Sequence, residues 1–140
     1  MVSTPRKDRG PALSGKVAIV TGGASGIGRE TSLLFAQEGA SVTIVDLDSE
    51  GGQKTAQDIK QEGLLAFFVQ TDVTDESDCK QAVNRTISEF GQLDILFNNA
   101  GIIQRTSVLN SSEADWDRVM GVNVKGVFLM SKHAIPTMLN

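Results

Sequence analysis

Residues 21–28 read Thr-Gly-Gly-Ala-Ser-Gly-Ile-Gly, and this stretch decides the fold because it joins a strand pattern to a helix pattern. The run before it, Lys16–Val20 (KVAIV), is short, apolar and rich in β-branched residues. From Ile27 to Glu38, apolar positions recur at helical spacing, and Gly39 is placed to end that helix. Glycines between a strand and a helix permit a sharp turn and let a phosphate approach the backbone amides at the helix start. An ordinary tight turn is the alternative interpretation, whereas a P-loop is excluded because no Gly-Lys-Ser/Thr follows.

The same alternation continues along the chain. Strands are predicted at 41–46, 65–69 and 93–97, and helices at 50–62, at 75–90 after a Thr74 cap, and from about 113 to the end after a Ser111 or Ser112 cap. The strands are continuous apolar runs, which is typical of strands buried on both faces of a parallel sheet. The sequence therefore predicts an α/β fold with right-handed crossovers, and Cys79 falls on the buried face of its helix.

Composition narrows the class of protein. The 140 residues suit one domain, and 40% apolar residues are too many for a disordered chain. No apolar run reaches the ~18 residues of a membrane helix, and the net charge of −4 argues against a nucleic-acid partner. The single cysteine excludes an intrachain disulfide or a multi-cysteine metal site, so no metal is expected. Residues 1–13 lack a secretory signal, which predicts a flexible arm before a domain at 14–140 and a cytoplasmic location.

Asp46 carries the prediction of a nucleotide. It ends the second predicted strand, 18 residues after Gly28, so it should lie beside the glycine turn. A carboxylate there can accept hydrogen bonds from both hydroxyls of an adenosine ribose and would repel a 2′-phosphate. No Lys or Arg follows at 47–49, and Ser25 is not basic either, so NAD is favoured over NADP. The alternative is that Asp46 is a helix-capping or loop residue.

Four ordered motifs resemble those of the short-chain dehydrogenase/reductase family. They are TGGASGIG at 21–28, Asp72-Val73, Asn98-Asn99-Ala100-Gly101 and Val122-Asn123-Val124-Lys125-Gly126. The resemblance runs from about Leu13 to the last residue. It implies a doubly wound parallel sheet of the Rossmann type with strand order 3-2-1-4, in which the fourth strand is an open edge and later strands are missing from this chain.

The resemblance also implies residue roles. Gly22, Gly26 and Gly28 would shape the turn, and Ser25 and Ile27 would contact the cofactor near its pyrophosphate. Asp46 would bind the adenosine ribose, Asp72 the adenine amino group, and Val73 would supply a backbone contact. Asn99, Ala100 and Gly101 would line the nicotinamide-side ribose. Asn123 would bend the fifth helix so that its backbone carbonyl orders a water in a catalytic proton relay.

The implied reaction is NAD(H)-dependent hydride transfer between the nicotinamide and a small carbonyl compound or secondary alcohol. The family performs it with a Tyr general acid/base, a Lys in Tyr-x-x-x-Lys and a Ser. This sequence has no Tyr, so we expect the 140 residues to be a cofactor-binding half, truncated in the fifth helix and inactive alone. A non-catalytic NAD-binding module and a structural dimerisation unit are the alternatives. The last helix carries Trp116, Phe128 and His133 and is apolar on more than one face, which predicts association, with His133 exposed or in an interface. The resemblance implies a homo-oligomer, a dimer or tetramer, at full length.

Overall fold

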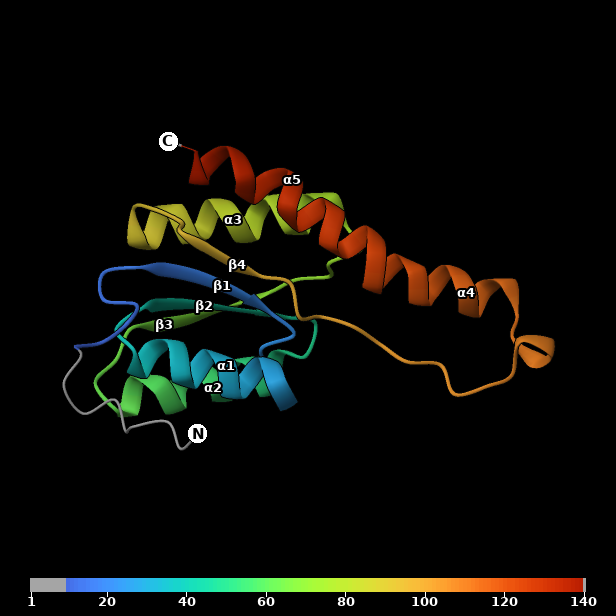
Figure 1. The fold of residues 1–140 in the computed structure, drawn as a ribbon, viewed down its shortest axis with the longest axis horizontal. Helices are drawn as coiled ribbons and strands as arrows, with labels where there is room; N and C mark the ends of the chain where they lie inside the picture. The colour runs from blue at the N-terminus through green and yellow to red at the C-terminus, as the bar shows by residue number, and fades with distance from the viewer. Residues whose placement is uncertain (1–9, 140) are drawn as a thin grey trace, which may run out of the picture.

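The computed structural model describes residues 10–139 and contains one four-stranded parallel sheet in the order β3-β2-β1-β4. Helices α1 and α2 cover one face of the sheet, and α3 and α5 cover the other (Figure 1). The elements are β1 (Val17–Thr21), α1 (Gly26–Gln37), β2 (Ser41–Asp46), α2 (Ser49–Gln61), β3 (Ala66–Gln70), α3 (Glu76–Phe90), β4 (Ile95–Phe97), η1 (Val108–Asn110), α4 (Glu113–Met120), η2 (Gly121–Lys125) and α5 (Gly126–Met138). The predicted α/β class, the parallel sheet and the strand order 3-2-1-4 are confirmed.

Two apolar clusters, one on each face, hold the helices to the sheet. Ile19 and Val45 belong to the cluster under α3 and α5, whereas Val20 and Ile44 belong to the cluster under α1 and α2. All four side chains are completely buried, so neighbouring residues of one strand serve opposite faces. Each such burial contributes about 1.5–3 kcal/mol, which explains why most positions of these strands are apolar.

The sequence predicted one helix end correctly and one helix start incorrectly. Gly39 has φ of 92° and donates its N–H to the carbonyl of Ala36, so it ends α1 as predicted. The predicted cap of α3 at Thr74 is wrong. The side chain of Asp75 accepts hydrogen bonds from the amides of Ser77 and Asp78, while Thr74 bonds to Asp72 instead. A carboxylate competes better than a hydroxyl for these amides because it is charged and faces the positive end of the helix.

Two predicted strands begin later in the structure than in the sequence pattern. Leu65 lies before β3 and is 63% exposed, and Leu93 lies before β4 although it is buried. Apolar character alone therefore placed β3 one residue too early and made β4 two residues too long. Cys79, in contrast, is fully buried in α3 as predicted, and its thiol donates to the carbonyl of Val73.

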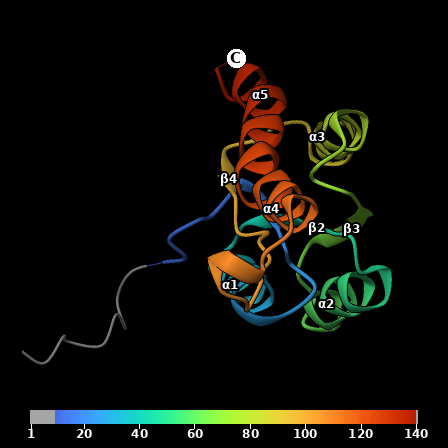
Figure 2. The ribbon, with the colours of Figure 1, turned by 90° about the vertical axis from the view of Figure 1, so that its right-hand side faces the viewer.

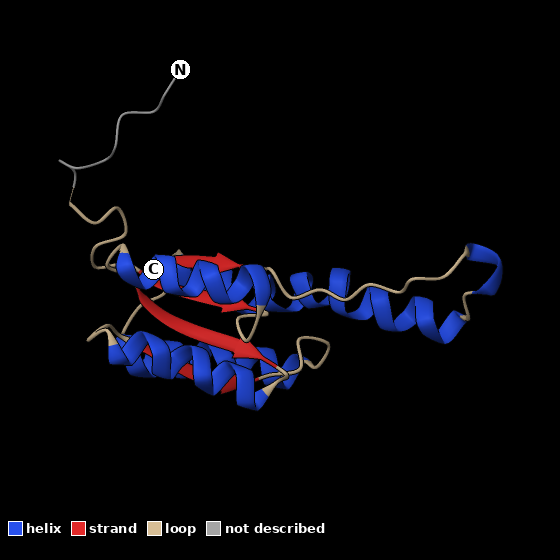
Figure 3. Cartoon of the chain, turned by 90° about the horizontal axis from the view of Figure 1, so that it is seen from below, coloured by secondary structure: helices blue, strands red, loops and turns tan. Residues whose placement is uncertain are grey.

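The C-terminal region forms a long projection from the sheet. The chain from Ile102 to Ser112 runs outward past η1, and α4 returns towards the body (Figures 1 and 3). Ser112 caps α4 in a reciprocal pair of bonds with Asp115. The predicted last helix is thus present, but the π-helical turn η2 divides it into α4 and α5.

The beginning of the described chain is held against the end of α1. Ala12 donates its N–H to the side chain of Glu38, and Leu13 donates to the backbone carbonyl of the same residue. Residues 1–9 of the predicted arm lie outside the described residues, so the boundary at 13 stays a prediction. Among residues 10–139, no helix has the length and hydropathy needed to cross a bilayer.

Candidate functional site

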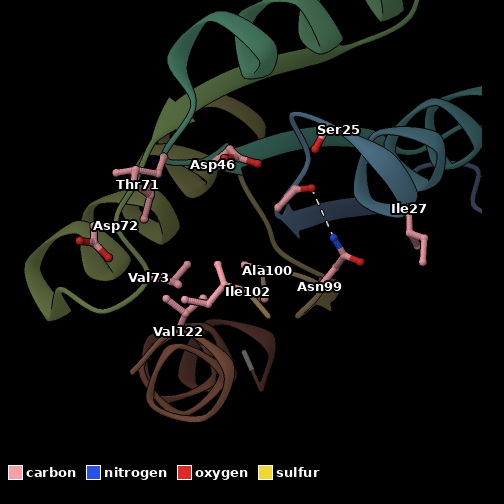
Figure 4. Close-up of a pocket in the computed structure, with 13 residues that line it drawn as sticks. Ser25, Ile27, Asp46, Thr71, Asp72, Val73, Asn99, Ala100, Ile102 and Val122 are labelled. Atoms are coloured by element: carbon pink, nitrogen blue, oxygen red, sulfur yellow. Dashed lines mark hydrogen bonds between the residues drawn. The ribbon is translucent and has the colours of Figure 1, made fainter. Parts of the chain in front are cut away.

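A cavity of about 410 Å³ opens at the carboxyl ends of the four strands. In open α/β sheets, this edge is where ligands bind, at the point where the strand order reverses between β1 and β4. Figure 4 shows Asp46 and Ser25 on one side and Val73, Ile102 and Val122 on the opposite side. The lining residues are Gly22, Ser25, Ile27, Asp46, Leu47, Thr71, Asp72, Val73, Asn99, Ala100, Gly101, Ile102 and Val122.

The glycine turn is tightly packed. The backbone of the turn and the side chain of Asn99 occupy the space that a side chain at Gly28 would need. A Cβ on Gly28 would lie 2.0 Å from the carbonyl oxygen of Gly22 and 2.6 Å from Nδ2 of Asn99. Gly22 has φ of 67° and Gly26 has φ of 52°, a region that disfavours other residues. At Gly26, the space around the position of a Cβ is open, so a ligand can approach the backbone there. Gly26 and Gly28 shape the turn without lining the cavity.

Thr21 and Asn99 connect the third predicted motif, Asn98–Gly101, to this turn. Oγ1 of Thr21 accepts the N–H groups of Asn99 at 3.0 Å and Ala100 at 2.9 Å. Nδ2 of Asn99 donates back to the carbonyls of Thr21 at 3.1 Å and Gly22 at 3.3 Å (Figure 4 shows the bond to Gly22). The ends of β1 and β4 are therefore fixed relative to each other, and Asn99 holds the cavity wall through these bonds.

The carboxylate of Asp46 is held in place by two backbone amides. Oδ2 accepts from Ala24 and Oδ1 from Asp48, both at 3.0 Å. A carboxylate oxygen has two lone pairs, so each oxygen keeps one acceptor position after these bonds. Asp46 is half-buried and lines the cavity. The alternative that it caps α2 is not what the structure shows, because Asp48 accepts from Gly51 in that role.

Asp72 and Val73 form the wall that follows β3. Oδ1 of Asp72 accepts both the N–H and the hydroxyl of Thr74, at 2.8 and 2.7 Å. Val73 is buried and packs so closely on α5 that a Cβ on Gly126 would lie 2.8 Å from its side chain. This contact explains the glycine in the fourth motif: it lets α5 approach the end of β3.

Asn123 lies in the π-helical turn, and its side-chain amide hydrogen-bonds to the backbone of the residue that follows Gly101. Its Oδ1 accepts the N–H of Ile102 at 2.8 Å, and its Nδ2 donates to the carbonyl of Ile102 at 2.9 Å. The turn closes with a bond from Gly126 N–H to the carbonyl of Gly121, five residues back. Asn123 lines a neighbouring cavity of about 260 Å³ rather than the first one.

His133, expected to be exposed or in an interface, is largely buried and lies 3.1 Å from Glu76. The pKa of Glu76 is lowered chiefly by a hydrogen bond from Lys132.

The comparisons with known proteins agree with this architecture. A sequence model described as short chain dehydrogenase matches residues 16–140. The chain belongs to the short-chain dehydrogenase family. It is 46% identical to secoisolariciresinol dehydrogenase of Forsythia intermedia over 129 residues, which cover 91% of this chain and 46% of that protein. It is 45% identical to tropinone reductase-like 1 of Erythroxylum coca over 131 residues, 91% of this chain and 47% of that protein. An uncharacterized oxidoreductase of Thermotoga maritima is 46% identical over 126 residues, 90% of this chain and 49% of the relative.

The chain spans about half the length of these curated relatives. In this short-chain dehydrogenase chain, the structure gathers nine of the predicted cofactor residues around one cavity: Gly22, Ser25, Ile27, Asp46, Asp72, Val73, Asn99, Ala100 and Gly101. Sequence reasoning missed four further lining residues: Leu47, Thr71, Ile102 and Val122. Each is the immediate neighbour of a predicted site residue. Its position next to that residue is the feature of the sequence that could have identified it.

Proposed function

We propose that this chain is the NAD(H)-binding part of an oxidoreductase of the short-chain dehydrogenase type. The observation that carries the proposal is the carboxylate of Asp46, which two backbone amides hold at the end of β2 with acceptor positions left over. The two hydroxyls of an adenosine ribose are the donors that such a group suits. The bound cofactor would supply hydride transfer with a carbonyl or secondary alcohol. The names of the relatives include both a dehydrogenase and a reductase, so neither direction is favoured.

The start of α1 fits the pyrophosphate of the cofactor. Among the described residues, no side chain caps this helix and no acidic residue lies in its first turn. Its first amides are therefore free to bind an anion, and the helix dipole adds to the attraction. Ser25, at the cap position, and Ile27, 73% exposed, stand where they would contact a bound dinucleotide.

The charges around the cavity favour NAD over NADP. No Lys or Arg lines the cavity in the part of the chain that the structure describes, whereas Asp46 and Asp72 both do. A 2′-phosphate would lie against the carboxylate of Asp46 without a cation to compensate. Asp72 keeps Oδ2 available for the adenine amino group, because the bonds from Thr74 go to Oδ1.

We assign positioning roles to Asn99 and Asn123. Asn99 holds the wall on the nicotinamide side through its bonds to the turn, together with Ala100 and Gly101. Asn123 fixes Ile102, and the π-helical turn leaves backbone carbonyls available for a proton relay, as the resemblance implies. The sequence contains no Tyr, so the 140 residues alone should bind the cofactor without turnover, as a non-catalytic NAD-binding module also would.

Calorimetric titration with NAD⁺ and with NADP⁺ tests the proposal. The unmodified chain should bind NAD⁺ more tightly. Asp46→Ala should weaken NAD⁺ binding by about 1.5–3 kcal/mol, the worth of hydrogen bonds to a charged group, and reduce the preference over NADP⁺. The control is Asp48→Ala, which removes a helix cap near the turn but no side chain of the cavity. No heat with either nucleotide, or an unchanged preference in Asp46→Ala, contradicts the assignment.

We also propose self-association through the outer face of α4, η2 and α5. Trp116, Val124, Phe128 and Ile135 are all more than half exposed along it, and exposed apolar side chains gathered in one region are typical of an interaction surface. Light scattering after gel filtration should show a dimer or larger species, and Phe128→Glu should shift it to the monomer. A monomer before substitution would contradict this. The cytoplasmic location stays a prediction, which cell fractionation can test.

A further inference from the structure

The outer edge of β3 has a row of unpaired backbone groups. Within residues 10–139, β3 pairs with β2 on one side and with no strand on the other, and Figure 2 shows it at the side of the sheet between α3 and α2. The carbonyl of Leu65 and the N–H of Thr71 both bond to β2. Since successive residues of a strand point their backbone groups to alternate sides, Ala66, Phe68 and Gln70 direct N–H and C=O outward. This is a template for a further strand.

A groove of about 480 Å³ runs along this edge. Its walls are Gln53, Ala56, Gln57 and Lys60 of α2, Phe67 and Phe68 of β3, and Arg85 of α3. Phe67 packs with the cluster under α3, and Phe68 packs with the cluster under α2, so each aromatic ring forms the floor of one side. Both rings are only partly buried. The groove thus combines backbone donors and acceptors with apolar surface on both faces of the sheet.

Two cations border the groove without a carboxylate partner in the described structure. Lys60 and Arg85 are exposed and take part in no ion pair there, although Arg85 lies 5.6 Å over the ring of Phe67. Two acidic residues lie two positions from Lys60 in sequence. Asp58 pairs with Arg29 and Lys54, and Glu62 accepts a hydrogen bond from Gln37. In a chain of net charge −4, two unpaired cations on opposite faces of one strand edge are complementary to acidic side chains.

We propose that the β3 edge binds an extended acidic segment of a partner protein as a fifth strand. Main-chain hydrogen bonds to Ala66, Phe68 and Gln70 give the affinity, as in other cases of strand addition. Lys60 lies on the α2 face and Arg85 on the α3 face, so the partner must place one carboxylate on each face. Neighbouring residues of a strand point to opposite faces. The preferred partner therefore has two adjacent acidic residues, or two that are three apart, between β-branched ones.

The probe is a fluorescein-labelled peptide of sequence Thr-Val-Glu-Glu-Val-Thr, and the readout is fluorescence anisotropy with the purified protein. It should bind, and Thr-Val-Lys-Lys-Val-Thr should bind more weakly, because its cations meet Lys60 and Arg85. Two further peptides carry N-methyl groups on the first, third and fifth or on the second, fourth and sixth residues. Only one set of amides faces β3 in an added strand, so one of these peptides should bind and the other should not. Equal binding of the two, or no binding of the acidic peptide at millimolar concentration, overturns the proposal.

Variants of the protein locate the site. The double variant Lys60→Gln, Arg85→Gln should weaken binding about twofold to thirtyfold, the range for two exposed ion pairs. Arg85→Lys should retain most of the affinity, and Lys80→Gln, an exposed cation outside the groove, should retain all of it. Amide resonances of Ala66, Phe68 and Gln70 should shift on titration with the peptide. If they shift with protein concentration and not with peptide, the edge pairs with a second copy and the proposal is wrong. None of these measurements uses a nucleotide, so they stand apart from the cofactor proposal.

Discussion

Replacing Thr21 by Val should destabilise the protein while leaving the shape of the residue nearly unchanged. The side chain is 1% exposed, and its Oγ1 is the acceptor for the N–H groups of Asn99 and Ala100. A buried donor left without an acceptor costs about 1–3 kcal/mol. Asn99 and Ala100 are half-buried, so hydrogen bonds from their amides to water offset part of this cost. We expect the free energy of unfolding to fall by about 2–4 kcal/mol.

The control is Thr21→Ser, which keeps the hydroxyl and loses one methyl group, a cost of about 1 kcal/mol. Urea unfolding followed by far-ultraviolet circular dichroism measures both variants. The fluorescence of the single tryptophan is a poor probe, because Trp116 is 64% exposed on the projecting helix. If Thr21→Val were as stable as Thr21→Ser, the two amides would not depend on this hydroxyl, and the account of how β1 and β4 are joined would be wrong.

Three further predictions concern other parts of the molecule. Gly28→Ala should abolish nucleotide binding in calorimetry, because its Cβ would lie 2.0 Å from the carbonyl of Gly22; binding at full affinity would contradict this. The pKa of Asp94 lies below its ordinary value of 3.8, chiefly because the N–H of Val17 bonds to it. Its contribution to stability is therefore complete above that value and lost as the pH falls through the lower, folded pKa, so the stability difference between the wild type and Asp94→Asn should shrink between pH 5 and pH 2 in urea titrations. Burial raises the pKa of the Cys79 thiol to about 11, so a disulfide reagent at pH 8 should label it only after denaturation, and rapid labelling of the native protein would show that α3 opens readily.

The fold could be predicted because its signals are local. Strands such as Ser41–Asp46 are apolar runs between turn residues, and α3 buries Cys79, Ala82, Val83 and Thr86 at helical spacing. The ends of the elements could not be predicted to the residue. At Thr74, two neighbouring side chains could each cap the helix, and the choice depends on Asp72, which engages Thr74. That competition is set by how the end of β3 meets α3, and no periodicity records it.

Most of the candidate site could be predicted because its residues follow the strands directly. Asp46, Asp72 and Asn99 each come at or just after the end of a strand, and parallel strands bring such positions to one edge. The residues that were missed, Thr71 and Ile102 among them, are sequence neighbours of predicted site residues, and no motif assigns a role to either.

The sequence does not reveal which residue the side chain of Asn123 hydrogen-bonds to. Ile102 lies 21 residues away, and both its N–H and its C=O bond to the amide of Asn123. An Asn in a helix interior is an unfavourable choice for helix stability alone. Here the π-helical turn lets its amide reach a loop that would otherwise leave backbone groups to solvent. These two bonds also fix the segment that follows Gly101 at the edge of the cavity, so one residue links the geometry of the helix to the shape of the cavity wall.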